Sequence, residues 1–347
     1  MKKSLFIMAL GAIALTSCSQ DEIIEVKKDA IGFSVATENA SRANVAGNIT
    51  TSTLPSFNVY AYDAVTGGAY ISNVNAVVDT GDQVPGAFML TNTYYWPINK
   101  LNFYCVYPAT KELTAIDVDN ANAKIASYSC ENTGTAYHSE DLLYSVSMET
   151  TKGAGGVAAI NFRHALSMLA FQAKSDASYG LDVTISKVEI VNVANSGSYT
   201  LPNETTGALV SGAGNRGVWA STVFTNTYTF DIDDITVSAN NNAVASGDSY
   251  FALPQALASG SATKTENAYF KLYCDVSRNG SAIRVATNPI YVPVDGTWAE
   301  GYKYTYTFVF GAGAGYEEDL ETPVIVPISF NCTVDEMQAA DAQNVTM

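Results

Sequence analysis

The strongest constraint on the fold is an alternation of apolar and polar residues with a period of two, which recurs along most of the chain. The longest run sets aromatic side chains at every second position of residues 302–310, and shorter runs cover 57–61, 101–107 and 270–276. This alternation is typical of β-strands with one buried face. No stretch has a convincing helical period, so we expect an all-β fold.

Clusters of Gly, Asn, Ser and Asp separate these runs and predict turns between antiparallel strands. The clearest is Arg278-Asn279-Gly280, because Asn-Gly tolerates the positive φ angles of a type I′ hairpin turn. Only 15% of the residues are charged and 47% are apolar, which is not the composition of a disordered chain or of a helical one. The expected sheets are therefore antiparallel and enclose buried cores.

A length of 347 residues indicates about two domains. The flexible run Lys152-Gly153-Ala154-Gly155-Gly156 precedes a fresh apolar segment and predicts a boundary. We therefore expect one β-sandwich domain over residues 43–156 and a second over 157–347. A single large sandwich or barrel is the weaker alternative, because about 300 residues exceed the usual size of one hydrophobic core.

The N-terminus has the pattern of a bacterial lipoprotein export signal. Met1-Lys2-Lys3 is positively charged, residues 5–15 are apolar, and Leu15-Thr16-Ser17-Cys18 resembles a lipobox. We expect residues 1–17 to be removed as a signal peptide. Cys18 would then be lipidated, with palmitate among its acyl chains, and would anchor the chain in the outer membrane. The alternative is an ordinary signal peptide followed by a chance cysteine.

The net charge is −16, from 18 basic and 34 acidic residues. A field of this sign repels phosphate backbones, so we expect no nucleic-acid partner. Outside the leader no apolar run has the length of a membrane-spanning helix. The stretch Ser19-Gln20-Asp21-Glu22 is similar to the acidic tether of surface-displayed lipoproteins, although a solvated linker would look the same.

Residue patterns for catalysis and metal binding are scarce, so we expect no enzyme activity, no cofactor and no metal. Two histidines, His138 and His164, leave almost no material for a His-dependent catalytic triad or for a zinc site with two imidazoles. Asp231, Asp233 and Asp234 lack the glycine and glutamate of a calcium loop, and we expect them in a solvated turn. A glycosidase with two carboxylates stays a low-ranked alternative, because the separation it requires is spatial.

Four cysteines follow the lipobox, and an exported location permits disulfides. If each domain closes on itself, Cys105 pairs with Cys130 and Cys274 pairs with Cys332, which is one of three possible connectivities. Buried free thiols are an equal alternative.

A short strand pattern lies at the start of the mature chain. Ile31, Phe33 and Val35 alternate with small or polar residues shortly before Arg42, the only arginine among the first 160 residues. Small polar neighbours around Arg42 suit the cleft of a trypsin-like protease.

A longer single-faced pattern lies near the C-terminus, where Val324, Val326, Ile328 and Phe330 alternate with other residues. Such a strand can close its own domain or can add to a sheet of another chain, with backbone hydrogen bonds for affinity and alternate side chains for specificity. The segment alone does not distinguish these two roles.

Together these features resemble the fimbrillin family, whose members are lipoprotein precursors of fimbrial subunits. Besides the lipobox and the strand before Arg42, the resemblance is carried by short motifs in the family's order: Tyr95-Trp96-Pro97, residues 101–108, Asp141-Leu142-Leu143-Tyr144, Phe162-Arg163-His164-Ala165-Leu166, Leu253-Pro254-Gln255 and residues 298–306.

The resemblance implies two transthyretin-like β-sandwich domains in tandem and a structural role in adhesive cell-surface fimbriae. It implies that an Arg-specific protease cuts between Arg42 and Ala43 and releases the propeptide of residues 18–42 with its strand. A donor strand within residues 324–347 of another copy, or of a related fimbrial subunit, would then fill the empty groove. Joining of this kind does not close on itself and gives a filament.

Two alternatives to a stalk subunit remain open. The first alternative is an anchor or tip subunit, which the family also includes. Family members often carry a Trp where this chain has Glu336-Met337, and this difference leaves the donor register open. The long C-terminal segment favours a stalk. The other class is a surface glycan-binding lipoprotein that uses aromatics such as Trp96 or Trp219, although aromatics in a sandwich more often fill the core or its rim.

Overall fold

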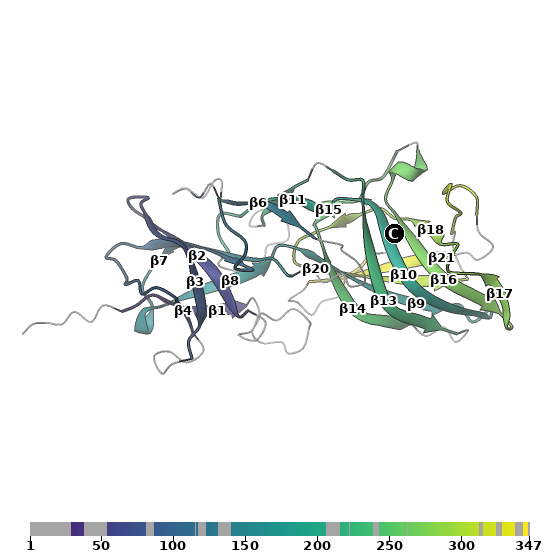
Figure 1. Ribbon diagram of the computed structural model, residues 1–347, viewed down its shortest axis with the longest axis horizontal. Coiled ribbons are helices and arrows are strands. Elements are labelled where there is room, and N and C mark those ends of the chain that lie inside the picture. The colour runs from purple at the N-terminus through teal and green to yellow at the C-terminus, as the bar shows by residue number, and fades with distance from the viewer. Residues whose placement is uncertain are drawn as a thin grey trace, which may run out of the picture.

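The computed structural model describes residues 29–37, 54–80, 87–114, 116, 123–130, 140–205, 216–221, 223–238, 243–261, 263–311, 315–323, 328–336 and 343–345. These ranges are all-β apart from two three-residue 3-10 helices, η1 (Ala154–Gly156) and η3 (Lys264–Glu266), which confirms the expected class. No helix within them is long and apolar enough to cross a membrane. The molecule is elongated, with the earlier strands in one half and the later strands in the other (Figure 1).

The N-terminal half is a closed barrel with the strand order β1-β4-β3-β2-β5-β7-β8. Neighbours are antiparallel except β1 and β8, which run parallel. The glycine-rich run at 152–156 connects β7 to β8. Both strands belong to this barrel, so β8 is part of the N-terminal half. The strands are β1 (Gly32–Thr37), β2 (Ser56–Asp63), β3 (Ala69–Val78), β4 (Phe88–Leu90), β5 (Leu101–Tyr107), β7 (Leu143–Thr150) and β8 (Val157–His164).

The C-terminal half contains two five-stranded sheets that share one core. One has the order β13-β10-β16-β17 with β18 beside β16, and the other has the order β14-β9-β20-β21-β22. The ring of Phe171 in β9 lies 5.1 Å from that of Phe230 in β13, so side chains of both sheets meet. The strands are β9 (Ser167–Ser175), β10 (Leu181–Val193), β13 (Asn226–Val237), β14 (Val244–Ala252), β16 (Tyr269–Arg278), β17 (Ser281–Arg284), β18 (Ile290–Pro293), β20 (Tyr302–Phe310), β21 (Ile328–Glu336) and β22 (Gln343–Val345).

The larger of two apolar cores reaches from the C-terminal half onto the outer face of the barrel. Phe103 and Cys105 of β5 face the barrel interior, whereas Tyr104 and Val106 of the same strand belong to the larger core of the C-terminal half. Both faces of β5 are therefore buried. Smaller sheets add to this region: β6 (Lys124–Ser129), β11 (Ser196–Thr200) and β12 (Val218–Ala220) form one, and β15 (Gln255–Ala256) pairs with β19 (Thr297–Trp298).

The hairpin expected at Asn279-Gly280 is confirmed. β16 pairs with β17 across this turn, and Asn279 and Gly280 have φ angles of 49° and 75°. Both lie in the left-handed region, which glycine and asparagine adopt at the lowest cost.

The prediction of a solvated turn at Asp231, Asp233 and Asp234 was wrong, because these residues lie within β13. Ile232 and Ile235 are buried in the core and hold the segment against β10. A register irregularity in the same stretch interrupts the plain alternation that would have marked a strand.

The four cysteines after the lipobox are buried free thiols, which agrees with the second of the two alternatives and not with the disulfide pairings. Cys105 lies in the barrel core and Cys130 in the larger core, and Cys274 and Cys332 lie in different sheets.

Candidate assembly site

β1 is enclosed on both edges. It pairs with β4 at Gly32 and Phe33, and with β8 along its whole length from Gly32 to Thr37. Removal of β1 would leave unpaired backbone groups on both neighbours. Such edges are a template for another strand.

The side chains of β1 form part of the barrel core. Ile31 is 1% exposed and Phe33 is fully buried, while Val35 is partly buried against the same cluster. The ring of Phe33 makes edge contacts with Phe57 and Phe103, at centroid distances of 5.9 and 5.3 Å. Departure of β1 would therefore open an apolar groove lined by aromatic rings.

The start of β1 is held by residues 94–96, which we call the entry loop. The backbone N–H of Ile31 donates to the carbonyl of Tyr94 at 2.8 Å, and that of Trp96 donates to the carbonyl of Asp29 at 3.2 Å. The carboxylate of Asp29 lies 2.8 Å from Nζ of Lys152. The chain entering the barrel is thus fixed by backbone bonds and by one exposed ion pair.

The tryptophans considered for glycan binding have structural contacts. Trp96 donates its ring N–H to the carbonyl of Gly156 at 2.6 Å and packs on Phe103. Trp219 donates to the carbonyl of Ala165 at 2.7 Å and packs on Tyr199. These contacts agree with the interpretation that the aromatics fill the core and its rim.

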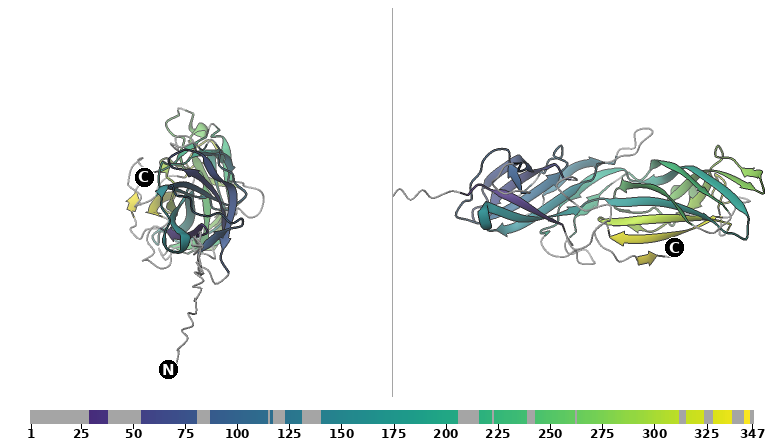
Figure 2. Two further views of the ribbon diagram at one scale, coloured as in Figure 1. Left: turned by 90° about the vertical axis from the view of Figure 1, so that its left-hand side faces the viewer. Right: turned by 90° about the horizontal axis from the view of Figure 1, so that it is seen from below.

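The last strands lie at the edge of their own sheet. β21 pairs with β20 from Ile328 opposite Phe310 to Glu336 opposite Tyr302, and β22 adds three pairs on its outer side. Figure 2 shows β21 and β22, in yellow, along one side of the C-terminal half. Within one copy, β21 closes its own domain.

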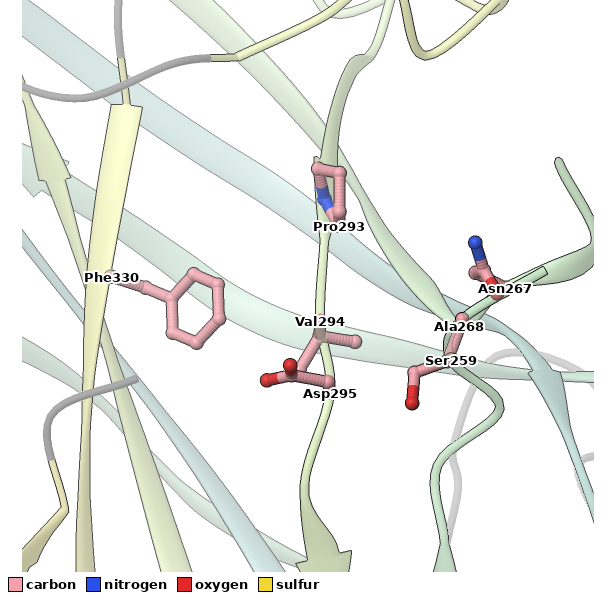
Figure 3. A pocket seen from close by; sticks show the side chains of 8 residues that line it. Ser259, Asn267, Ala268, Pro293, Val294, Asp295 and Phe330 are labelled. Atoms are coloured by element: carbon pink, nitrogen blue, oxygen red, sulfur yellow. The ribbon is translucent and has the colours of Figure 1, made fainter. Parts of the chain in front are cut away.

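β21 packs into its own domain through Ile328 and Cys332, which are buried, and through Phe330, whose partly buried ring lies 6.0 Å from that of Phe270 and 5.9 Å from that of Tyr306. A pocket of about 320 Å³ lies beside Phe330, between this strand and the segment of Val294 and Asp295 (Figure 3). A second pocket of about 190 Å³ is lined by Cys332 and Val334. Phe330 and Val334 are only partly buried beside these pockets, so the side chains of β21 are less completely covered than Phe33 of β1.

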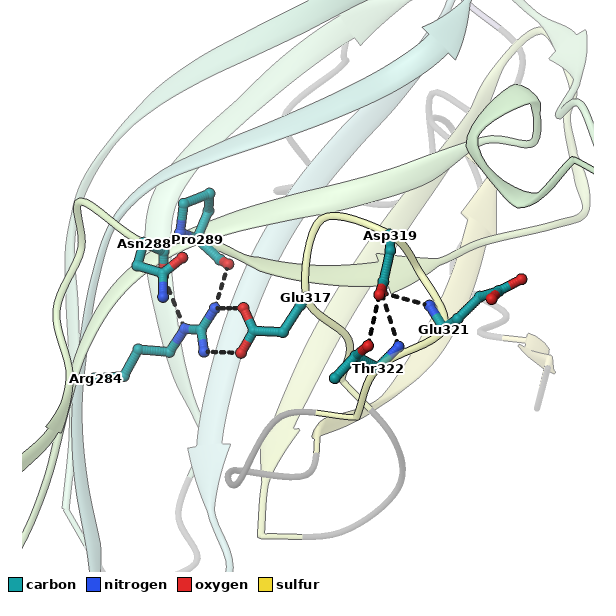
Figure 4. A network of polar contacts seen from close by, with 7 residues as sticks. All are labelled: Arg284, Asn288, Pro289, Glu317, Asp319, Glu321 and Thr322. Carbon is teal, nitrogen blue, oxygen red and sulfur yellow. Dashed lines mark hydrogen bonds and ion pairs between the residues drawn. The ribbon is translucent and has the colours of Figure 1, made fainter.

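The chain is firmly fixed just before β21. The guanidinium of Arg284 donates to both carboxylate oxygens of Glu317, at 3.0 and 2.9 Å, and this pairing lowers the pKa of Glu317 (Figure 4). Tyr316 pairs with Tyr291 of β18 through two backbone bonds. Asp319 accepts bonds within the same loop, including one from the N–H of Thr322. We call residues 315–323 the anchor loop.

The structure describes half of the residues that the sequence analysis assigned to lipidation, processing and strand exchange. Cys18, Arg42, Ala43, Val324 and Val326 lie outside the described residues. The residues of β1 and those of β21, including Ile328 and Phe330, lie in separate sheets of different halves and are not brought together within one copy.

A buried polar cluster at the junction of the halves was missed by the sequence analysis. The carboxylate of Glu300 accepts bonds from the hydroxyls of Tyr144, at 3.0 Å, and Tyr199, at 2.6 Å, and from the backbone N–H of Gly217. Burial raises the pKa of Glu300 to about 7. Tyr144 belongs to the barrel and Glu300 precedes β20, so the cluster links the halves. No sequence spacing relates these residues.

Among solved structures, this fold is found in bacterial fimbrial proteins. The chain matches a fimbrial protein from Bacteroides vulgatus with a TM-score of 0.60 and 15% identity, over 89% of this chain and 99% of that one. A putative cell adhesion protein from Bacteroides uniformis gives 0.49 and 15%, over 90% and 98%. The tip fimbrial protein Mfa3 from Porphyromonas gingivalis gives 0.37 and 11%, over 80% and 92%.

A sequence model of the fimbrillin-like family matches residues 41–335, and the chain belongs to this family. No curated protein matches the chain. The resemblance noted in the sequence is therefore confirmed.

Proposed function

We propose that this protein is a structural subunit of adhesive cell-surface fimbriae, exported as a lipoprotein that Cys18 anchors in the outer membrane. The barrel and the paired sheets of the C-terminal half would be its two transthyretin-like domains. The observation that carries the proposal is the position of β1, a core strand near the chain's start with Phe33 fully buried. Such a strand can be replaced by another of matching alternation.

Cleavage between Arg42 and Ala43 would free β1 for this replacement. β1 ends at Thr37, and Arg42 follows five residues later, so the cut would separate the strand from the rest of the barrel. The family match begins at residue 41, so β1 lies outside the matched region. An Arg-specific protease would thus remove residues 18–42 together with the lipid.

A strand from the C-terminal segment of another copy would then enter the empty groove. Support comes from the incomplete burial of Phe330 and Val334 in β21 and from the anchor loop, which would hold the donor to its own subunit. Each subunit would fill the groove of one neighbour and receive a strand from another. This head-to-tail contact does not close on itself, so a filament grows.

The test is the substitution Arg42→Ala in the native cells. The matched control is Arg278→Ala, which removes an exposed arginine from the β16–β17 turn without touching the propeptide. We expect Arg42→Ala to abolish fimbriae in electron micrographs and to leave a lipid-anchored precursor, while the control assembles normally. Fimbriae of normal length from the Arg42→Ala chain would contradict the proposed processing.

A further inference from the structure

We propose that β21 of one copy takes the place of β1 in the next copy residue for residue and in the same chain direction, with Ile328 at the position of Ile31. The inference rests on the proposed function and deepens it, because it assigns the register of the exchanged strand and the way in which two copies meet.

The first support is the similarity of the two strands. Residues 31–35 read Ile-Gly-Phe-Ser-Val, and residues 328–332 read Ile-Ser-Phe-Asn-Cys. Alternate side chains of a strand face one side, so the groove would receive Ile, Phe and a small side chain in the order that β1 presents them. A shift by two residues in this direction would place Ile328 or Cys332 in the pocket that Phe33 occupies.

The second support is the environment of the central aromatic ring. In β1 the ring of Phe33 is fully buried between Phe57 and Phe103. In its own domain Phe330 makes edge contacts with Phe270 and Tyr306, but its ring is only partly buried and lines the larger pocket. Transfer into the groove would bury more of this ring, and burial of apolar surface is the main favourable contribution to such an exchange.

The third support is the backbone at the entry to the groove. The backbone bonds at this point use the carbonyl of Asp29 and the N–H of Ile31. In the proposed register Pro327 would take the position of Ala30. Proline has no N–H to donate and is tolerated at the start of a strand, so it fits there.

The next position is also compatible. Ser329 would replace Gly32, where an added Cβ would lie 2.6 Å from Sδ of Met89. This sulfur is near the end of a flexible side chain and can move aside.

The chain direction follows from where the two ends of β1 lie. Its start is at the free end of the barrel with the entry loop, and its end at Thr37 pairs with Phe162, close to the start of β9 and the other half (Figure 1). A donor strand in the same direction would enter from beyond the free end. The reverse direction would bring it in at the junction of the halves.

The anchor loop then limits how far apart two copies can lie. It ends at Pro323, and an extended chain of about 3.5 Å per residue covers about 17 Å from there to Ile328. The anchor loop of the donor must therefore approach the entry loop of the acceptor. Two copies would meet end to end along the long axis of the molecule.

The test is disulfide cross-linking between copies. Ser34 and Ala159 are paired residues of β1 and β8, and both are exposed. In the uncleaved chain, Ser34→Cys with Ala159→Cys should form an internal disulfide, which checks the geometry of the pair. After cleavage and assembly, Asn331→Cys with Ala159→Cys should cross-link neighbouring copies, because Asn331 replaces Ser34 in this register.

The matched controls shift the donor position by two residues. Ser329→Cys and Thr333→Cys, each with Ala159→Cys, should give at least tenfold less cross-linked ladder on a non-reducing gel after mild treatment with oxidised glutathione. The native thiol of Cys274 should stay unreactive, because burial raises its pKa to about 12.

The outcomes separate this inference from the proposed function. A ladder with Asn331→Cys and not with the shifted positions supports the register. If the cleaved chains polymerise but a shifted position cross-links instead, the register is wrong while strand exchange stands. If the cleaved parent chain stays monomeric, strand exchange itself fails and the register falls with it.

Discussion

β1 and β21 present the same order of side chains but are held in different ways. β1 lies between two strands of a closed barrel, and Phe33 is fully buried among aromatic rings. β21 lies between β20 and the three-residue β22, with two pockets along its inner face. The alternation in the sequence specifies that both are strands, whereas their packing determines which of them can leave at low cost.

Truncation of the central ring in each strand should show this difference most strongly. In the uncleaved chain, Phe33→Ala should lower the free energy of unfolding by about 3–5 kcal/mol, the usual cost for a fully buried Phe. The matched variant Phe330→Ala should cost roughly 1–2 kcal/mol, because less apolar surface is lost from a partly buried ring.

Urea denaturation of the two variants measures both values. The midpoint should fall much further for the barrel variant, with the same slope in both. Equal losses, or a larger loss for Phe330→Ala, would mean that β21 is held as tightly as β1.

The two cores should also differ in their response to pH. Glu300 is the one buried carboxylate among the described residues, and its pKa of about 7 lies above the ordinary value of 4.5. The unfolded chain loses this proton first as the pH rises. This group therefore destabilises the fold progressively between about pH 4.5 and 7, by on the order of 3 kcal/mol.

The variant Glu300→Gln isolates this contribution. The difference in unfolding free energy between wild type and variant should change across that pH range, while Asp182→Asn, at an exposed position of β10, serves as the control. Hydrogen exchange should locate the effect at the junction and in β20 rather than at β1. A pH-independent difference would show that Glu300 keeps an ordinary pKa.

The smallest expected effect concerns the ion pair at the entry to β1. Lys152→Ala removes the partner of Asp29, and an exposed pair of this kind contributes at most about 1 kcal/mol. Lys100→Ala is the matched control, because its pair with Glu149 is similarly exposed but does not involve the propeptide.

Hydrogen exchange in β1 of the uncleaved chain measures this effect. We expect exchange to be a few times faster in Lys152→Ala and unchanged in Lys100→Ala. An equal effect of both substitutions would mean that the pair does not act on β1 specifically.

The sequence predicted the local elements of the fold better than their assembly. The alternation located β2, β5, β16 and β20, because each strand buries at least one face. It did not show that β5 is buried on both faces, or that a glycine-rich run would connect two strands of one barrel. These features depend on contacts between distant segments, which no local pattern encodes.

The same limit applies to the candidate site. The termini stood out because Ile31, Phe33 and Phe330 sit in short alternating runs that can be read directly. Other features arise only when distant strands are brought together. They are the incomplete burial of Phe330, the ion pair of Arg284 with Glu317 in the anchor loop, and the buried cluster around Glu300.

N-terminal sequencing of this protein, after it is sheared from the surface of its native cells and separated by size, tests the proposed processing most directly. We expect a sequence that begins at Ala43, in material far larger than a monomer. A lipid-blocked Cys18 on monomeric protein would contradict it, because β1 would then still be joined to its barrel and no groove would have opened.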